Sequence, residues 1–119
     1  MGMETEEDPE ILRPVLARVG RGWGRSVSCG EGWWPIIARL DRDIAALAPD
    51  YEIHQVKEKF GGLRYYVGLP DDAPDDEIDR LIAVAEEESS RTCEVCGQPG
   101  RLRGGGWVLT LCDVHSTRE

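Results

Sequence analysis

The sequence CEVCG at residues 93–97 and the sequence CDVH at residues 112–115 decide the fold of the last quarter of the chain. A CxxC pair followed by a CxxH pair at this separation is the spacing typical of tetrahedral zinc sites. The predicted ligands of a Zn²⁺ ion are Cys93, Cys96, Cys112 and His115. Because three thiolates and one imidazole leave no position open for water, the predicted zinc is structural rather than catalytic. The alternative is that these residues form disulfides or are unrelated.

The segment between the two ligand pairs is typical of a small hairpin. Residues 101–103 and 107–111 favour strands, and the glycines at residues 104–106 favour a turn between them. Such a hairpin would bring the second ligand pair back beside the first. Gly97 suits a tight knuckle in which backbone N–H groups point at thiolate sulfur. The CxxH pair would begin a short final helix, as in treble-clef modules.

The chain is short and acidic. Its 119 residues have room for one domain with a modest core plus a metal-stabilised appendage. With 14 basic and 23 acidic residues the net charge is −9, which disfavours general binding to nucleic acid or to membrane surfaces. No run approaches about 18 apolar residues and the first residues are acidic, so we expect neither a membrane span nor a secretory signal. The metal site leaves Cys29 as a single free thiol, which favours the reducing cytoplasm.

Two helices are predicted in the N-terminal half, after a disordered acidic tail at residues 1–8. Apolar residues recur at helical spacing over residues 9–19, where Pro14 predicts a kink or a start near residue 14. A glycine-rich loop and a short strand at residues 25–29 follow. The clearest helix then begins near Pro35 and ends before Pro49. Its apolar stripe is Ile37, Leu40, Ile44 and Leu47, and the residues predicted to face mostly solvent are Arg39, Asp41, Arg42 and Asp43.

Residues 51–69 predict a β-hairpin. Gly61 and Gly62 supply the positive φ angles of a tight turn between strands near residues 51–59 and 63–69. The acidic segment after Pro70 begins another helix, which runs to about Ser90. The residues predicted to be buried are Leu63, Tyr65, Val67 and Leu69 of the second strand and Ile78, Leu81, Ile82 and Ala85 of the helix.

These elements predict an α+β fold in which helices pack on an antiparallel β-hairpin. A zinc-ribbon or treble-clef-like hairpin completes the C-terminal end. The predicted organisation is an acidic tail at residues 1–8, an α+β body at residues 9–91 and a zinc-binding hairpin module at residues 92–119.

Three blocks of the sequence together resemble one group of proteins. They are CGEGWWPII from Cys29, QVKEKFGGLRYY from Gln55, and TCEVCG from Thr92 with LCDVH from Leu111. The set spans roughly residues 23–116 and resembles small bacterial and phage proteins described as hypothetical, in which a KEKFGGLR-type segment precedes a terminal zinc ribbon. The resemblance implies a shared fold, and it implies no activity and no catalytic role.

The predicted hairpin is locally basic. Residues 51–69 carry three basic and two acidic side chains, and a positive hairpin on an acidic body favours docking of a phosphate or an acidic partner surface. Alternatively, its basic residues pair with Glu52, Glu58 or the acidic helix. Trp33 and Trp34 would point about 100° apart on a helix, so one can anchor the core and the other a partner, unless both belong to the core. The predicted partner-binding residues are Lys57, Lys59, Phe60, Arg64 and Trp34.

The sequence shows no reactive constellation, because nothing places His54 beside the spare thiol of Cys29. We therefore expect a non-enzymatic, zinc-stabilised module that binds or regulates another protein. Inhibition of a host factor is one form of that role, by analogy with small phage proteins. The alternative is an accessory zinc-ribbon protein that binds nucleic acid through the basic hairpin and through Arg101 and Arg103.

Overall fold

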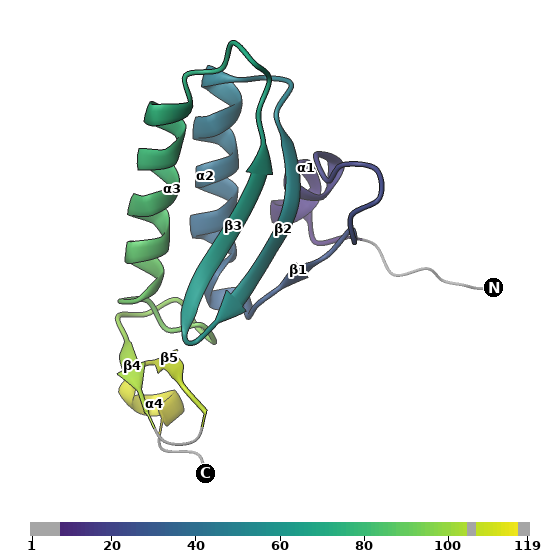
Figure 1. Cartoon of the computed structure of the whole chain (residues 1–119). Coiled ribbons are helices and arrows are strands. Elements are labelled where there is room, and N and C mark those ends of the chain that lie inside the picture. Colours follow the sequence, from purple (N-terminus) through teal and green to yellow (C-terminus); the bar gives the residue numbers. More distant parts are fainter. Residues whose placement is uncertain (1–7, 105–106, 117–119) are drawn as a thin grey trace, which may run out of the picture.

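A three-stranded sheet forms the centre of the body in the computed structural model, which describes residues 8–104 and 107–116 (Figure 1). Its strands are β1 (Val27–Ser28), β2 (Glu52–Lys59) and β3 (Gly62–Gly68), in the order β1–β2–β3. β2 and β3 are antiparallel, as predicted, whereas β1 runs parallel to β2. The sequence predicts the strand β1 but not its partner, because a pairing between segments this far apart leaves no local signal.

Two helices cover one face of this sheet and give the mixed α+β fold. In Figure 1, α2 (Trp34–Leu47) lies behind the sheet, and α3 (Asp75–Ser89) lies beside α2, along the outer edge of β3. Their apolar stripes meet the strand side chains on this face, because successive side chains of a strand point to opposite sides. The fully buried residues of this core include Ile37, Ile44, Ile53, Leu63 and Ile78. Of the other predicted core residues of β3, Tyr65 is buried, and Val67 and the following Leu69 are half-buried.

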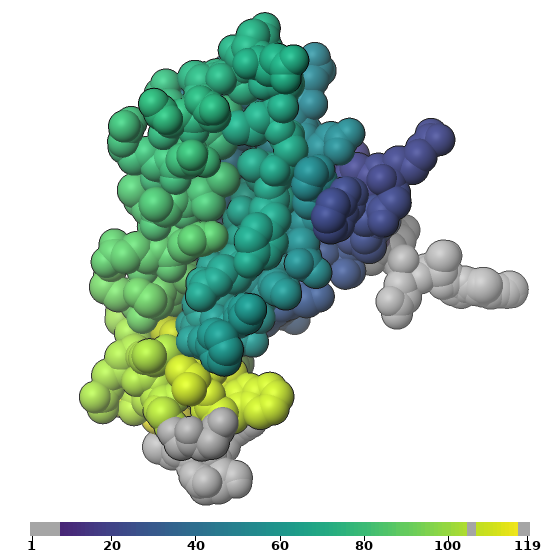
Figure 2. Space-filling model, in the orientation of Figure 1, coloured from purple at the N-terminus to yellow at the C-terminus, as the bar shows by residue number. Residues whose placement is uncertain are grey.

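The opposite face of the sheet is polar. No helix of the described residues covers it, and its side chains are open to view in the space-filling picture (Figure 2). Lys57 of β2 lies directly opposite Arg64 of β3, and the exposed Tyr66 follows on the same face. The basic residues of the hairpin therefore lie on the uncovered side of the sheet.

The outer edge of β3 is covered by α3. The backbone N–H of Leu63 donates to the hydroxyl of Ser89 over 3.0 Å, and that of Tyr65 donates to the Glu86 carboxylate over 3.2 Å. Burial raises the pKa of Glu86, although the Tyr65 N–H and the charge of Arg64 favour its ionised form. These contacts satisfy strand N–H groups that would otherwise be open to pairing with another chain.

The N-terminal helix starts close to the predicted point. A 3₁₀ turn, η1 (Glu10–Leu12), precedes α1 (Arg13–Ala17), and Pro14 lies in the first turn of α1, where its missing N–H costs little. Buried side chains of this segment pack into the core of the body, and they are Leu12, Val15 and Leu16. Residues 1–7 of the predicted acidic tail lie outside the described residues, and Asp8 accepts a hydrogen bond from Arg25 over 2.6 Å.

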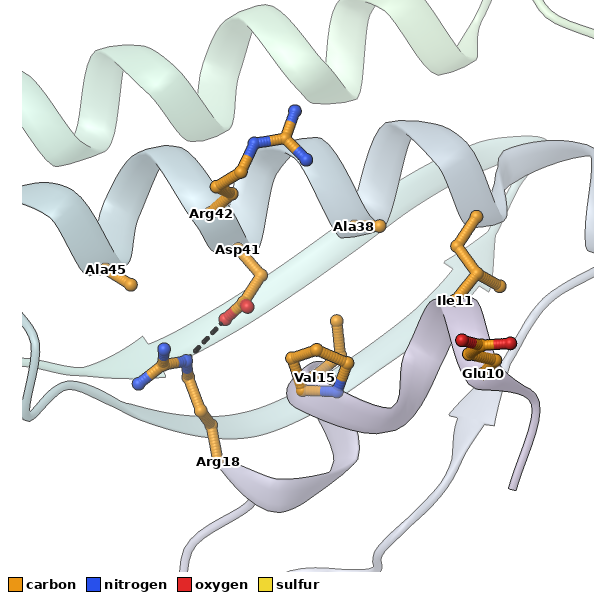
Figure 3. A pocket seen from close by; sticks show the side chains of 9 residues that line it. Glu10, Ile11, Val15, Arg18, Ala38, Asp41, Arg42 and Ala45 are labelled. Atoms are coloured by element: carbon orange, nitrogen blue, oxygen red, sulfur yellow. Dashed lines mark ion pairs between the residues drawn. The ribbon is translucent and has the colours of Figure 1, made fainter. Parts of the chain in front are cut away.

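The prediction that Asp41 faces mostly solvent is wrong, since only 3% of this residue is exposed. Arg18, directly after α1, pairs with its carboxylate, Nε to Oδ1 over 2.7 Å (Figure 3), and the Tyr51 hydroxyl donates to it over 2.5 Å. Tyr65 then donates to Tyr51 over 2.8 Å. Helical periodicity predicts that Asp41 lies next to the apolar stripe of α2, near solvent. Asp41 is buried because Arg18 and Tyr51, from the segments just after α1 and just before β2, pack over this part of α2. Arg39, Arg42 and Asp43 are exposed, as predicted.

The C-terminal end consists of a second, smaller sheet and a single helical turn. β4 (Arg101–Arg103) pairs antiparallel with β5 (Leu109–Leu111), and α4 (Asp113–Ser116) follows. β5 begins two residues later than predicted, because Trp107 and Val108 do not pair with β4. Gly105 and Gly106 of the predicted turn lie outside the described residues. Among the helices that the structure describes, none is long and apolar enough to cross a bilayer.

Candidate metal centre and basic hairpin tip

Three cysteines and one histidine converge at the C-terminal end, as their spacing predicts. The ligand atoms of Cys93, Cys96, Cys112 and His115 all lie within 4.8 Å of one another. The Sγ atoms of Cys96 and Cys112 are 3.8 Å apart, well beyond the ~2.05 Å of a disulfide bond. All of the cysteines in the chain are free thiols, which removes the disulfide alternative. The cluster has the donor atoms and the proximity needed to hold a metal ion.

The first ligand pair lies on a tight turn. Gly97 has a φ of +83°, and its N–H donates to the Cys93 carbonyl over 2.9 Å. The N–H of Cys93 in turn donates to the Gln98 carbonyl over 2.7 Å. Burial opposes ionisation of Cys93, but backbone N–H groups, first among them that of Cys112, lower the pKa of this thiol to about 6. The N–H groups of this turn, together with that of Cys112, therefore favour a thiolate, the form that binds metals.

The second ligand pair lies where β5 passes into α4. Nδ1 of His115 is 3.2 Å from Sγ of Cys112 and 3.6 Å from Sγ of Cys93. The backbone N–H of His115 lowers the pKa of the Cys112 thiol, and the Cys112 and Cys93 side chains raise the pKa of His115. The single turn of α4 thus directs the imidazole back toward the thiols. The predicted short helix after Cys112 is confirmed.

The turn that carries Cys93 is hydrogen-bonded to the body through a segment that the sequence did not assign to the site. Gly30 and Gly32 donate their N–H groups to the Oε2 atom and the carbonyl oxygen of Glu94, each over 2.8 Å. A Cβ at Gly32 would lie only 2.1 Å from the Cys93 carbonyl oxygen, so no larger residue fits there. The CGEG sequence at residues 29–32 could have predicted this contact, because glycines often occur where two backbones approach closely.

The basic residues of the hairpin make no ion pair within the described residues. Direct pairing with nearby acids is therefore not seen in this part of the chain, although the charge of Arg64 acts against the rise that burial causes in the pKa of Glu86 in the acidic helix. Glu52 contacts His54 instead, over 3.4 Å, and Glu58 accepts the Gly61 N–H over 2.7 Å. Arg64 donates only to the carbonyl of Leu63, over 3.2 Å. Lys57, Lys59 and Arg64 therefore keep charges that an outside group can meet.

Phe60 forms the outermost part of the hairpin turn and is 72% exposed. Its φ of +55° lies in the left-handed region, which is unusual for a bulky residue. Trp34, the other aromatic residue predicted to meet a partner, begins α2 and is half-buried against the core. Its neighbour Trp33 is fully buried, so one indole of the pair anchors the core, as predicted.

The two arginines of the alternative nucleic-acid surface differ in their surroundings. Arg103 pairs with Asp113 over 2.9 Å and donates from Nε to the Leu111 carbonyl over 3.1 Å. The charge of Arg103 is therefore largely matched, and it lowers the pKa of Asp113. Arg101 is exposed and forms no ion pair within the described residues.

The two other side chains that could take part in catalysis, those of His54 and Cys29, do not form a common site. His54 stacks on Trp23, with ring centroids 4.5 Å apart, whereas Cys29 packs at the edge of the core. Burial, followed by the charges of Glu94 and Glu58, raises the pKa of the Cys29 thiol to about 12. That shift opposes the thiolate that a nucleophile requires. Neither a family model, nor a curated protein, nor a solved structure matches the chain.

Proposed function

We propose that this chain is a zinc-stabilised, non-enzymatic module that binds another protein through the basic tip of its β2–β3 hairpin. The observation that carries the proposal is the set of three cations, Lys57, Lys59 and Arg64, that form no ion pair within the described residues. The role is regulatory, and inhibition of a host factor is one form of it. The reduced thiols of the metal cluster suit the cytoplasm.

The donor set and the distances support zinc as the metal. With Zn–S near 2.3 Å and Zn–N near 2.0 Å, a tetrahedral site separates two sulfurs by roughly 3.8 Å and sulfur from nitrogen by roughly 3.5 Å. The corresponding separations are 3.8 Å for Cys96 and Cys112 and 3.6 Å for Cys93 and His115. The Cys112–His115 separation, 3.2 Å, is shorter. A ligated turn, a hairpin and a ligated helical turn follow one another as in a treble clef, the zinc-module class that we propose.

The uncovered sheet face supports protein binding over a purely structural role for the hairpin. Lys57 and Arg64 are directly opposite on neighbouring strands, and like charges in that position repel each other. An acidic partner surface would relieve this repulsion. The net charge of −9 speaks against a nucleic acid as the partner, because the whole molecule repels a polyanion at long range.

The non-enzymatic part of the proposal rests on the groups that could do chemistry. Three thiols and one imidazole would fill a tetrahedral metal site and leave no position for a substrate or a water molecule. The one other thiol, that of Cys29, has its pKa raised to about 12 by burial and by nearby acids. The one other imidazole, that of His54, is stacked on Trp23.

Affinity capture from cell lysate, with and without nuclease, tests the proposal. The test variant carries Lys57→Glu, Lys59→Glu and Arg64→Glu. The control variant carries Arg21→Glu, Arg42→Glu and Arg80→Glu, exposed arginines elsewhere that form no ion pair within the described residues, so its net charge changes equally. We expect one protein at stoichiometric yield with the wild type and with the control, and none with the test variant, at unchanged zinc content.

Two outcomes would contradict the proposal. Undiminished capture by the test variant would remove the hairpin tip from the mechanism. Captured material that disappears after nuclease treatment, and whose binding weakens steeply with added salt, would instead favour the nucleic-acid alternative and its exposed Arg101.

A further inference from the structure

A cavity at the hairpin tip lies between the two hairpins of the molecule. This tip groove has a volume of about 470 Å³ and is lined by Glu58, Lys59, Phe60, Trp107 and Val108. Its two aromatic walls are among the most exposed large apolar side chains in the described residues, with Phe60 72% and Trp107 75% exposed. Exposed aromatic residues that border a groove are typical of sites that bind another molecule.

The fold holds the two walls of the tip groove in place. The Thr110 hydroxyl donates to the Gly61 carbonyl over 2.6 Å, which links the β2–β3 turn to β5. A Cβ at Gly61 would lie 2.4 Å from Cδ1 of Leu102, so the turn also packs closely against β4. Phe60 keeps its left-handed φ of +55° in this position. Backbone strain of this kind persists only where the surroundings enforce it, and here it directs an aromatic ring outward.

The charges around the tip groove are predominantly positive. The ammonium of Lys59 lies 5.6 Å from the centre of the Phe60 ring, and Lys57 and Arg64 are opposite each other on the adjoining sheet face. The acid in the lining, Glu58, is already used, because it accepts the Gly61 N–H over 2.7 Å. A ligand that fits must therefore combine a bulky apolar group with negative charge.

We propose that the tip groove binds a short acidic segment of a partner protein, with a bulky apolar side chain between Phe60 and Trp107 and carboxylates on Lys57, Lys59 and Arg64. The inference rests on the proposed function and names the chemistry of its partner. Charge complementarity selects this occupant. A second copy of the chain is disfavoured, because each copy carries a net charge of −9 and the two repel each other.

Selection from a random displayed-peptide library on the metal-loaded protein tests the inference. We expect enriched peptides to place Asp or Glu on both sides of a Phe, Trp, Leu or Ile. Their affinity, measured with a synthesised peptide by fluorescence anisotropy, should fall at least about tenfold in Phe60→Ala and in Trp107→Ala, as for truncated binding hot spots. The matched control is Trp23→Ala, which removes a 48% exposed tryptophan of the N-terminal loop and should leave the affinity unchanged.

The outcomes separate the groove assignment from the proposed function. No enrichment, enrichment of basic peptides, or equal losses in Trp23→Ala and Trp107→Ala would overturn the groove assignment. So would a wild-type dimer in light scattering that Phe60→Ala converts to a monomer, because the groove would then be a self-interface. If lysate capture depends on Lys57, Lys59 and Arg64 but not on Phe60 or Trp107, the proposed function stands and the groove assignment fails.

Discussion

The indole Nε1–H of Trp33 donates to the backbone carbonyl of Thr92 over 2.8 Å, which links a fully buried side chain of the body to the residue directly before Cys93 of the metal-binding cluster. Alongside it, the N–H of Gly30 donates to the Glu94 carboxylate and the N–H of Gly32 donates to the Glu94 carbonyl. Several hydrogen bonds therefore join the segment around the metal cluster to the body, so we expect a substitution in one part to change the stability of the other.

Substituting Trp33 by Phe should destabilise the protein without removing a metal ligand. The Thr92 carbonyl would lose its donor, and an unsatisfied buried polar group costs about 1–3 kcal/mol. Urea unfolding followed by circular dichroism measures the loss. Trp107→Phe, at a 75% exposed position, should change the free energy of unfolding by no more than about 0.5 kcal/mol. Equal effects of the two substitutions would show that the Trp33–Thr92 hydrogen bond contributes nothing.

Removing the metal should melt the C-terminal module first. Structural zinc sites bind with an apparent ~10–16 kcal/mol at pH 7 in peptides, and this binding energy becomes folding energy. We expect Cys112→Ser, or excess chelator, to abolish metal binding and to lower the melting temperature. Cys29→Ser should keep about one metal per chain. Mass spectrometry of the metal content and thermal melts test the two variants. A chelator-treated protein with the same melting temperature as the metal-loaded protein would contradict the expectation.

The buried polar network of Arg18, Asp41 and Tyr51 should be important for stability. Asp41→Ala would leave Arg18 and the Tyr51 hydroxyl without their shared acceptor. Breaking a buried pair typically costs 3–5 kcal/mol, and we expect about 3 kcal/mol here because the Arg18 side chain remains 27% exposed. Asp43→Ala, at an exposed position of the same helix, should cost little. Urea unfolding of the two variants compares them directly.

The Cys29 thiol should react slowly in the folded protein. Its pKa is raised from 9.0 to about 12, so the thiolate fraction at pH 8 falls by about 10³ relative to the unfolded chain. Alkylation by iodoacetamide, followed by mass spectrometry of the Cys29 peptide, should be slower by a comparable factor in buffer than in urea. Because the unfolded thiol ionises first, stability should also decline as the pH rises from about 9 toward 12. Equal alkylation rates in both solvents would contradict the assignment.

Relieving the strain at Phe60 should separate stability from binding. Asn tolerates the left-handed region, where a bulky residue costs about 1–2 kcal/mol, and Phe60 buries little surface. We therefore expect Phe60→Asn to raise the free energy of unfolding while it weakens peptide binding in the tip groove. Tyr66→Asn, within β3, should lower stability instead. A destabilised Phe60→Asn variant would show that the turn is not strained.

Local sequence patterns were sufficient for most elements and for the metal ligands. The glycine pair predicted the hairpin because tight turns need positive φ angles, and Gly61 has a φ of +82°. The CxxC and CxxH spacings predicted convergence of the four ligand atoms, because one knuckle and one short hairpin suffice to bring them together. Each of these inferences depends on residues close together in the chain.

Only the tertiary structure decided how these local pieces meet. Asp41 is buried because Arg18 and Tyr51 reach it from separate elements, and the parallel pairing of β1 joins segments with no common local pattern. The Thr110–Gly61 hydrogen bond spans 49 positions, and it holds Phe60 beside Trp107. Periodicity and spacing in the sequence predict on which face of its own helix or strand a residue lies. Which element then covers that face depends on long-range packing, so the hairpin residues were predicted and the groove between the hairpins was not.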